Sequence, residues 1–343
     1  MSRTLGIITS AVAAIVAIPP AQAVAPVTTI RLATFAPANT TWHDALSEMG
    51  HAWQTSTEGR VRLTVFPGGS QGTEKTVIAF MRVGQLDAAL LLPGGLPEID
   101  DSARVFSMPF FLESDEELAY VLEKVGPAVE KRFEARGFRV LNWPTAGWAR
   151  LFSKEPIRNL ADAQKAKLFT SQGDERAVQW FRSNGFKPVA LSETQVLPQL
   201  KLPNGMIDAV PSPPYGAMAL QFYTAAPYML DLNIAPMVGA TVISEKTWSK
   251  IAPADRAKML VAAKVMQKRM MVEVSRLDAN SIAAMRKSRL TVTKLDPVAA
   301  AEFQATADRM VAGQRGAIVP ADIYDLAVKA RAEFRRSRDQ AGP

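Results

Sequence analysis

Apolar and polar residues alternate, or recur at helical spacing, through the first third of the chain in an order typical of α/β proteins. Residues 30–35 and 61–65 alternate as strands do, and residues 88–92 form a continuous apolar run, as in a strand that is buried on both faces. Between them, residues 42–53 and 74–83 carry apolar side chains on one helical face. This β-α-β-α-β series predicts an α/β domain with a mostly parallel sheet.

A second α/β unit is predicted after a strand at residues 138–142. Short strand patterns alternate there with a helical segment at residues 175–184, and the last part of the chain is almost entirely helical. Residues 253–287 contain one or two long helices, followed by helices at 297–315 and 321–339. Two α/β halves joined by chain crossings are typical of hinged binding proteins, which close on a ligand by rotating one lobe against the other.

The N-terminus has the pattern of a cleavable signal peptide. Arg3 gives a short positive region, residues 5–18 are mostly apolar, and Ala21-Gln22-Ala23 matches an A-x-A cleavage site. A retained membrane anchor is the alternative, but the apolar stretch is short and a cleavage site follows it. No later run approaches the roughly 18 apolar residues that a membrane helix needs. We therefore predict that residues 1–23 are removed and that the protein is exported to the periplasm.

The composition excludes several kinds of active site. The 343 residues include no cysteine and two histidines. His43 and His51 lie on one predicted helix, about 12 Å apart along its axis, so they cannot share a metal ion. Disulfides, thiolate nucleophiles and cysteine-based zinc sites are excluded. The hydrolase, metalloprotease, P-loop and dinucleotide-binding motifs are absent. The sequence therefore predicts no enzyme, no cofactor and no metal site built from histidine or cysteine.

The formal net charge of +7 does not indicate a nucleic-acid partner. The basic residues are scattered along the chain, apart from a cluster at residues 329–336. A nucleic-acid surface needs a continuous basic stripe, so we interpret this cluster as a solvated helix face.

Several segments from residue 30 onward stand in a characteristic order and spacing. These are Ile30-Arg-Leu-Ala-Thr-Phe, Trp42-His-Asp-Ala, residues 57–69, Arg82-Val-Gly-Gln-Leu-Asp-Ala-Ala, Pro109-Phe-Phe-Leu, Pro156-Ile-Arg-Asn-Leu-Ala-Asp and Gly205-Met-Ile-Asp-Ala. In these segments the chain resembles the DctP-type solute-binding proteins of tripartite ATP-independent periplasmic (TRAP) transporters, and the similarity runs through nearly all of the chain beyond the signal peptide.

The resemblance implies a two-lobed periplasmic binding protein fold of the α/β class, with a hinge and a long helix that crosses both lobes. We expect lobe I at residues 28–147 plus about 238–280, lobe II at 148–237 plus about 281–320, and a C-terminal helix at 321–343. The resemblance also implies no catalysis. It implies a cleft that closes over one small-molecule ligand and delivers it to TRAP membrane permease subunits driven by an ion gradient.

The resemblance breaks where the family binds the carboxylate of its ligand. Typical members use an arginine in the strand after the segment at 156–162, and this chain has Phe169 there. Arg150 resembles a second family arginine, and Ser212 matches a polar asparagine if a small insertion is allowed near residues 202–203. An arginine–carboxylate pair is directional and strong, so its loss predicts a ligand that is less acidic, or larger and more apolar, than the usual organic acids. Arg150 is either an anchor for an anion or part of a structural ion pair.

The predicted cleft combines these positions with aromatic residues and with loops at the carboxyl ends of strands, where α/β proteins bind ligands. We predict that it is lined by Phe35, Asn39, Trp42, Pro93, Trp148, Arg150, Phe169, Ser212 and Tyr215. A sensor subunit that presents the ligand to a membrane receptor is the alternative function, and the missing motifs disfavour an exported enzyme. The sequence leaves open the identity of the ligand, the help of a metal ion in binding it, and the oligomeric state.

Overall fold

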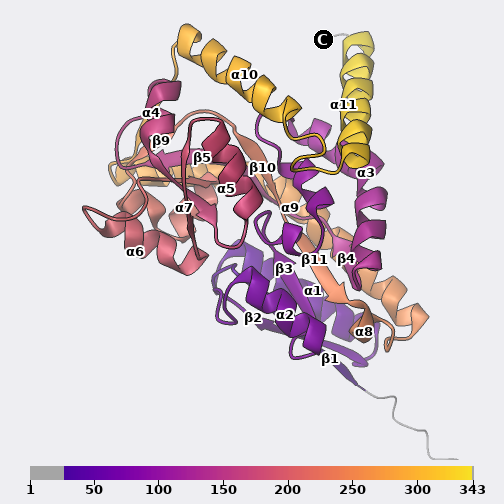
Figure 1. The fold of residues 1–343 in the computed structure, drawn as a ribbon. Helices are drawn as coiled ribbons and strands as arrows, with labels where there is room; N and C mark the ends of the chain where they lie inside the picture. Colours follow the sequence, from indigo (N-terminus) through magenta and orange to yellow (C-terminus); the bar gives the residue numbers. More distant parts are fainter. Residues whose placement is uncertain (1–26, 342–343) are drawn as a thin grey trace, which may run out of the picture.

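The computed structural model describes residues 27–341, and its first β-sheet is built mainly from the N-terminal part of the chain (Figure 1). The strands of this sheet are β1 Thr28–Thr34, β2 Val61–Phe66, β3 Ala88–Leu91, β4 Phe138–Asn142 and β11 Ala240–Ser244. They lie in the order β2-β1-β3-β11-β4. β1 pairs in parallel with β2 and β3, whereas β11 is antiparallel to both of its neighbours. The predicted parallel β-α-β-α-β series is confirmed, and we call this sheet with its helices the first lobe.

The second sheet has seven strands, and with its helices we call it the second lobe. Its strands are β5 Thr145–Ser153, β6 Lys167–Ser171, β7 Lys187–Leu191, β8 Ala209–Ser212, β9 Tyr228–Leu230, β10 Ala235–Val238 and β12 Thr291–Thr293. They follow the order β12-β9-β5-β8-β6-β7, with β10 also pairing β5. The pairs of β6 with β7 and β8 are parallel, while β5 is antiparallel to β8, β9 and β10.

Helices cover the two sheets and connect their strands (Figure 1). The α-helices are α1 Thr41–Ser56, α2 Glu74–Val83, α3 Asp115–Ala135, α4 Leu160–Lys165, α5 Glu175–Ser183, α6 Val196–Lys201, α7 Pro214–Ala219, α8 Glu245–Trp248, α9 Pro253–Lys287, α10 Pro297–Ala312 and α11 Ala321–Ala341. The short 3₁₀ helices are η1 Leu96–Glu98, η2 Asp101–Ser107, η3 Glu193–Gln195 and η4 Phe222–Thr224.

Local capping sets the ends of the helices that lead into the loops between the lobes. The Thr40 side chain accepts a hydrogen bond from the backbone of His43, so α1 begins one residue earlier than the sequence suggested. Thr73 caps α2 in the same way through the backbone of Thr76. Helix α2 ends at Gly84, whose φ of +80° is the left-handed conformation that glycine adopts without strain.

The 35-residue helix α9 contacts both lobes, as the resemblance implies. It packs against α1 and β4 of the first lobe and against β5 and α7 of the second. Near its start, the Met259 carbonyl accepts a hydrogen bond of 3.1 Å from the Trp53 indole, inside the core of the first lobe. Near its end, Met285 joins the core of the second lobe. The two-lobed α/β fold with a long crossing helix is therefore confirmed.

The C-terminal helix α11 packs along α3 of the first lobe (Figure 1). There Arg335 donates a hydrogen bond of 2.6 Å to the buried carboxylate of Glu117. The signal peptide predicted at residues 1–23 lies outside the described residues, and the residue boundaries of the lobes stay a prediction. Within residues 27–341, every helix is too short or too polar to serve as a membrane span.

Candidate functional site

A cavity of about 550 Å³ lies between the two sheets and is lined by residues of both lobes. The first lobe contributes the ends of β1 and β3 with the loops that follow them. The second lobe contributes the ends of β6 and β8 together with η3, α6 and α7. The cavity therefore lies at the carboxyl ends of strands, and its volume is in the usual range for a small-molecule site.

The lining of this cavity is mostly apolar and contains no arginine, lysine or histidine. Glu193 is the one charged residue of the lining. The polar remainder consists of hydroxyl groups and one amide, from Thr34, Thr145, Ser171, Thr194, Ser212 and Gln221. The site can bury an apolar ligand and offer it hydrogen bonds, but it offers a ligand carboxylate no cationic partner.

Four of the predicted site residues meet at this cavity, namely Phe35, Trp42, Phe169 and Ser212. Phe35 and Trp42 come from the loop after β1 and the start of α1, while Phe169 and Ser212 come from β6 and β8. The indole Nε1 of Trp42 is buried and has no hydrogen-bond partner within the described chain. Unpaired buried donors are uncommon, and a ligand acceptor would satisfy this one.

The predicted site residue Tyr215 joins the lobes behind Trp42 instead of lining the cavity. Its hydroxyl accepts a hydrogen bond of 2.9 Å from the backbone of Thr41 at the start of α1. Its ring meets Trp42 edge to face, with the ring centroids 4.8 Å apart. Its own backbone donates to Asp278 on α9 at 2.8 Å. Tyr215 therefore connects α7, α1 and the crossing helix α9.

Arg150 is not among the residues that line the main cavity. It forms an ion pair with Asp231 and borders a separate cavity of about 320 Å³. Of the two interpretations that the sequence allows, this contact favours the structural ion pair. A role of Arg150 as a ligand anchor stays a prediction.

The remaining three predicted residues also lie away from the cavity lining. The Trp148 indole donates to Asp115 at 2.8 Å. Asn39 is exposed and has a positive φ of 61°, and Pro93 is half-buried in the turn after β3. The sequence predicted the right loops here but not which side chains turn toward the cavity.

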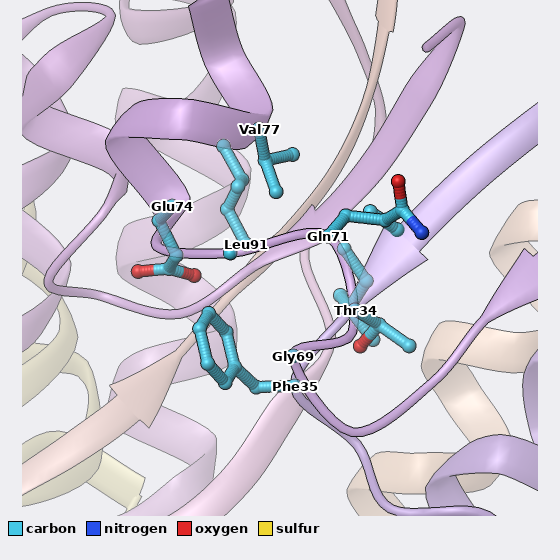
Figure 2. Close-up of a pocket in the computed structure, with 10 residues that line it drawn as sticks. Thr34, Phe35, Gly69, Gln71, Glu74, Val77 and Leu91 are labelled. Atoms are coloured by element: carbon cyan, nitrogen blue, oxygen red, sulfur yellow. The ribbon is translucent and has the colours of Figure 1, made fainter. Parts of the chain in front are cut away.

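A smaller pocket beside the main cavity holds a buried acid that sequence reasoning missed (Figure 2). Glu74, 5% exposed, opens α2, and one of its oxygens accepts a hydrogen bond of 2.5 Å from the backbone of Leu92. Its Oε2 is buried without a hydrogen-bond partner among the described residues. The sequence feature that could have drawn attention to Glu74 is an acid in the first turn of a helix. The favourable interaction of an acid with the helix dipole explains that feature equally well.

Glycine at position 69 lets the Phe35 ring lie against this pocket (Figure 2). Gly69 has a φ of +71°, and a Cβ there would lie 2.6 Å from Cε1 of Phe35. Any larger residue would strain the backbone and displace the ring. Gly69 is therefore required for the position of the Phe35 ring in the cavity wall.

The pKa values of both acids near the cavity are raised. Burial raises the pKa of Glu74 well above its usual range and the neighbouring Glu193 raises it further, while the backbone N–H groups of Leu92 and Gly95 act in the opposite direction. Burial also raises the pKa of Glu193, although hydrogen bonds from its own backbone and from the Ser171 hydroxyl lower it. Each acid thus lies in an environment that disfavours its negative charge.

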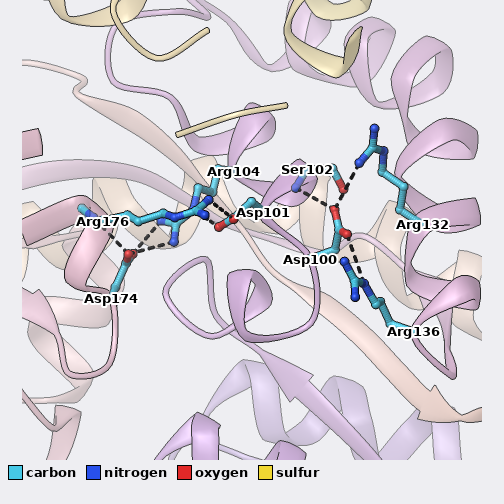
Figure 3. A network of polar contacts seen from close by, with 9 residues as sticks. Asp100, Asp101, Ser102, Arg104, Arg132, Arg136, Asp174 and Arg176 are labelled. Atoms are coloured by element: carbon cyan, nitrogen blue, oxygen red, sulfur yellow. Dashed lines mark hydrogen bonds and ion pairs between the residues drawn. The ribbon is translucent and has the colours of Figure 1, made fainter. Parts of the chain in front are cut away.

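An ion network crosses between the lobes on another side of the cleft (Figure 3). Arg104 of η2 donates to both oxygens of Asp174, the N-cap residue of α5, and also to Asp101. Arg176 donates to Asp101 at 2.5 Å. Since Asp101 and Arg104 belong to the first lobe and the other two to the second, these contacts connect the lobes.

A family model for the bacterial extracellular solute-binding proteins of family 7 (DctP) matches residues 32–315. The chain belongs to this family. It is a family of solute-binding proteins and not of enzymes, so the predicted family and the absence of catalysis are both confirmed.

The curated relatives share limited sequence identity with this chain. YiiZ, an uncharacterised protein of Salmonella typhimurium, is 28% identical over 168 residues, which are 48% of this chain and 50% of YiiZ. A solute-binding protein of Roseobacter denitrificans is 25% identical over 260 residues, 75% of this chain and 79% of that protein.

Two solved structures with the same fold hold sugar acids. The Roseobacter protein with bound L-galactonate has a TM-score of 0.78 at 23% identity, and the match covers 88% of this chain and 98% of that one. A TRAP periplasmic solute-binding protein of Xanthobacter autotrophicus with bound β-D-galacturonate has a TM-score of 0.81 at 21% identity, covering 88% and 99%. At these identities the likeness establishes the fold.

Proposed function

We propose that this protein is the periplasmic subunit of a TRAP transporter, which captures one small organic ligand in the 550 Å³ cavity and delivers it to the membrane permease. Family membership and the fold support the transport role. The cavity between two lobes joined by α9 supports capture by closure. Export through a signal peptide at residues 1–23 is part of this proposal.

The ligand in this proposal is less acidic, or more apolar, than the sugar acids bound by the structural relatives. One observation carries it: the cavity lining contains no arginine, lysine or histidine. Phe169 stands where the resemblance implies the carboxylate-binding arginine. A carboxylate buried there would lose its hydration without gaining a charge partner, which is costly.

A thermal-shift screen of the purified mature chain tests both the capture of a small ligand and the proposed ligand class. A ligand present at about 100 times its dissociation constant adds about 2.7 kcal/mol to the free energy of unfolding. We expect β-D-galacturonate to give no shift and uncharged or aromatic compounds of similar size to give one. Stabilisation by galacturonate would overturn the proposed ligand class, and chemical conversion of a bound compound would overturn the transport role.

A further inference from the structure

The outer face of the crossing helix α9 carries a stripe of exposed apolar side chains. Val261, Val265 and Val272 are 66%, 63% and 79% exposed. At 3.6 residues per turn, their spacing places them within about 40° of one another around the helix axis. The exposed residues Ala279 and Ala283 continue the same line, which makes the stripe about 33 Å long.

This stripe lies opposite to the side of α9 that packs into the protein. Each of the three valines follows a buried residue by two positions, and two positions correspond to about 200° around a helix. These buried residues, which belong to the core of the first lobe, are Met259, Ala263 and Met270. The packing of α9 therefore accounts for its inner face and gives no reason for valines on the outer one. Single exposed apolar residues are normal, whereas an aligned series of them marks an interaction surface.

The exposed charged residues that border the stripe are basic. Three of them form no ion pair within the part of the chain that the structure describes, namely Lys264, Lys268 and Arg276. The helical spacing places the two lysines on one side of the valines and Arg276 on the other. Long basic side chains can lay their apolar stems along such a stripe and extend their charged ends beyond it.

The acids of α9 do not offset these positive charges. The helix contains three acids, and each has a partner: Arg60 for Asp255, Arg269 for Glu273, and the backbone N–H of Tyr215 for Asp278. Arg269 also pairs with Glu48 of the neighbouring helix α1, so that acid is engaged as well. The outer face of α9 is therefore both apolar and positively charged.

An anionic lipid surface fits this face better than a second copy of the chain does. Two such faces in contact would bring lysines and arginines together without free acids between them, which is unfavourable. An anionic membrane instead offers negative headgroups to the basic residues and an apolar boundary to the valines.

We infer that α9 docks the protein on the surface of an anionic membrane through the valine stripe and the basic residues beside it. This inference goes beyond the proposed function and does not depend on the ligand. Docking of this kind concentrates the protein at the membrane, so a permease in the same membrane is reached by movement along the surface.

Cosedimentation of the purified mature chain with lipid vesicles tests the inference. One set of vesicles contains equal parts of phosphatidylglycerol and phosphatidylcholine, and the other contains phosphatidylcholine alone. Since each basic residue near an anionic surface strengthens binding by about fivefold, we expect at least about tenfold stronger partitioning to the anionic vesicles at low salt. Raising the salt concentration to about 0.5 M should remove most of this preference, because salt screens exposed charges.

Three variants assign the binding to the stripe. Val265→Glu places a negative charge within it and should weaken partitioning by at least about tenfold. Glutamate is a good helix former and the position is exposed, so the fold is retained. Val298→Glu adds the same charge at an 81% exposed valine on α10 and should keep most of the binding. Val265→Leu keeps the stripe apolar and should bind at least as tightly as the unmodified chain.

Several results would overturn the inference. These are the absence of binding to anionic vesicles at low salt, equal binding to both kinds of vesicle, and an equal loss of binding in Val265→Glu and Val298→Glu. A dimer in sedimentation velocity without vesicles, if Val265→Glu dissociates it, would also overturn the inference, because a second copy would then cover the stripe. These measurements contain no ligand, so capture in the cavity is tested separately by the thermal-shift screen.

Discussion

Arg104 of the first lobe donates two hydrogen bonds to Asp174 of the second lobe, with nitrogen–oxygen distances of 2.6 and 2.7 Å. The two side chains are only 13% and 11% exposed, so solvent and salt screen this pair less than a surface pair. Bidentate arginine–carboxylate geometry is directional and strong. Because the partners come from opposite lobes, the pair holds the lobes together as they lie in this structure and is lost when the lobes separate.

The variant Asp174→Asn should therefore favour the open arrangement. Asparagine keeps the side-chain oxygen that caps α5 through Ala177, so the helix start is retained while the charge is removed. We expect ligand affinity to fall by about tenfold. The closed fraction can be measured by fluorescence energy transfer between dyes at Val83→Cys and Leu202→Cys, exposed positions on the two lobes of a chain without cysteine.

An ion pair outside the cleft provides the control. Asp325 pairs with Arg315, both exposed, and Asp325→Asn should change neither closure nor affinity. Equal closed fractions in Asp174→Asn and the unmodified chain would contradict a role for the interlobe pair.

The second interlobe contact, between Tyr215 and Thr41, should also act on ligand binding. Tyr215→Phe removes the hydroxyl that accepts from the backbone of Thr41 and keeps the ring against Trp42. Losing one such hydrogen bond costs about 0.5–1.5 kcal/mol. We expect calorimetry to show a several-fold weaker affinity. Tyr223→Phe, whose hydroxyl makes no hydrogen bond within the described chain, is the matched control. A similar loss of affinity in Tyr215→Phe and Tyr223→Phe would mean that the hydrogen bond between Tyr215 and Thr41 has no specific effect on ligand binding.

Introducing an arginine at position 169 should allow the cavity to bind acids. Phe169→Arg would bring a guanidinium to the wall of the cavity, where the lining has no cation. We expect the variant to gain measurable binding of β-D-galacturonate in calorimetry and to lose affinity for uncharged aromatic compounds. Val298→Arg adds the same charge at an exposed position on α10 and should gain nothing. Galacturonate binding by the unmodified chain would contradict the argument.

The parts of the site that the sequence predicted are those set by local pattern. Alternation along β1 and the Pro37 break place Phe35 at a strand end, and the helical spacing after it places Trp42 at a helix start. Phe169 was found because a family resemblance drew attention to its strand. These positions follow from secondary structure, which short-range sequence determines well.

The parts that were missed depend on contacts between distant segments. Arg150 pairs with Asp231, which is 81 positions away, and no local pattern links the two. Glu193 is followed two residues later by Gln195, which forms a capping box with Ser192, so the segment has the local pattern of a helix start and not of a binding group. Its place in the cavity lining arises only when the two lobes meet.

A carboxyl on the crossing helix should make stability depend on pH. The pKa of Asp278 is raised to about 7, mainly by burial and also by Asp115, while the backbone of Tyr215 and the charge of Arg150 act in the opposite direction. An aspartate in the unfolded chain releases its proton near pH 3.8. Between about pH 4 and 7 the folded protein therefore holds a proton that the unfolded chain has lost, and the contribution of Asp278 to the free energy of unfolding falls as the pH rises.

Asp278→Asn should remove this pH-dependent contribution. The variant cannot ionise at this position, and its side-chain oxygen still accepts the hydrogen bond from Tyr215. Urea unfolding at pH 4.5, 6 and 7.5 should show the variant gaining about 1–3 kcal/mol relative to the unmodified chain as the pH rises. Other carboxyls contribute equally to both chains and cancel in this difference. Asp308→Asn, at an exposed site on α10, should follow the unmodified profile, and a constant difference between Asp278→Asn and the parent would mean that Asp278 is ionised throughout this range.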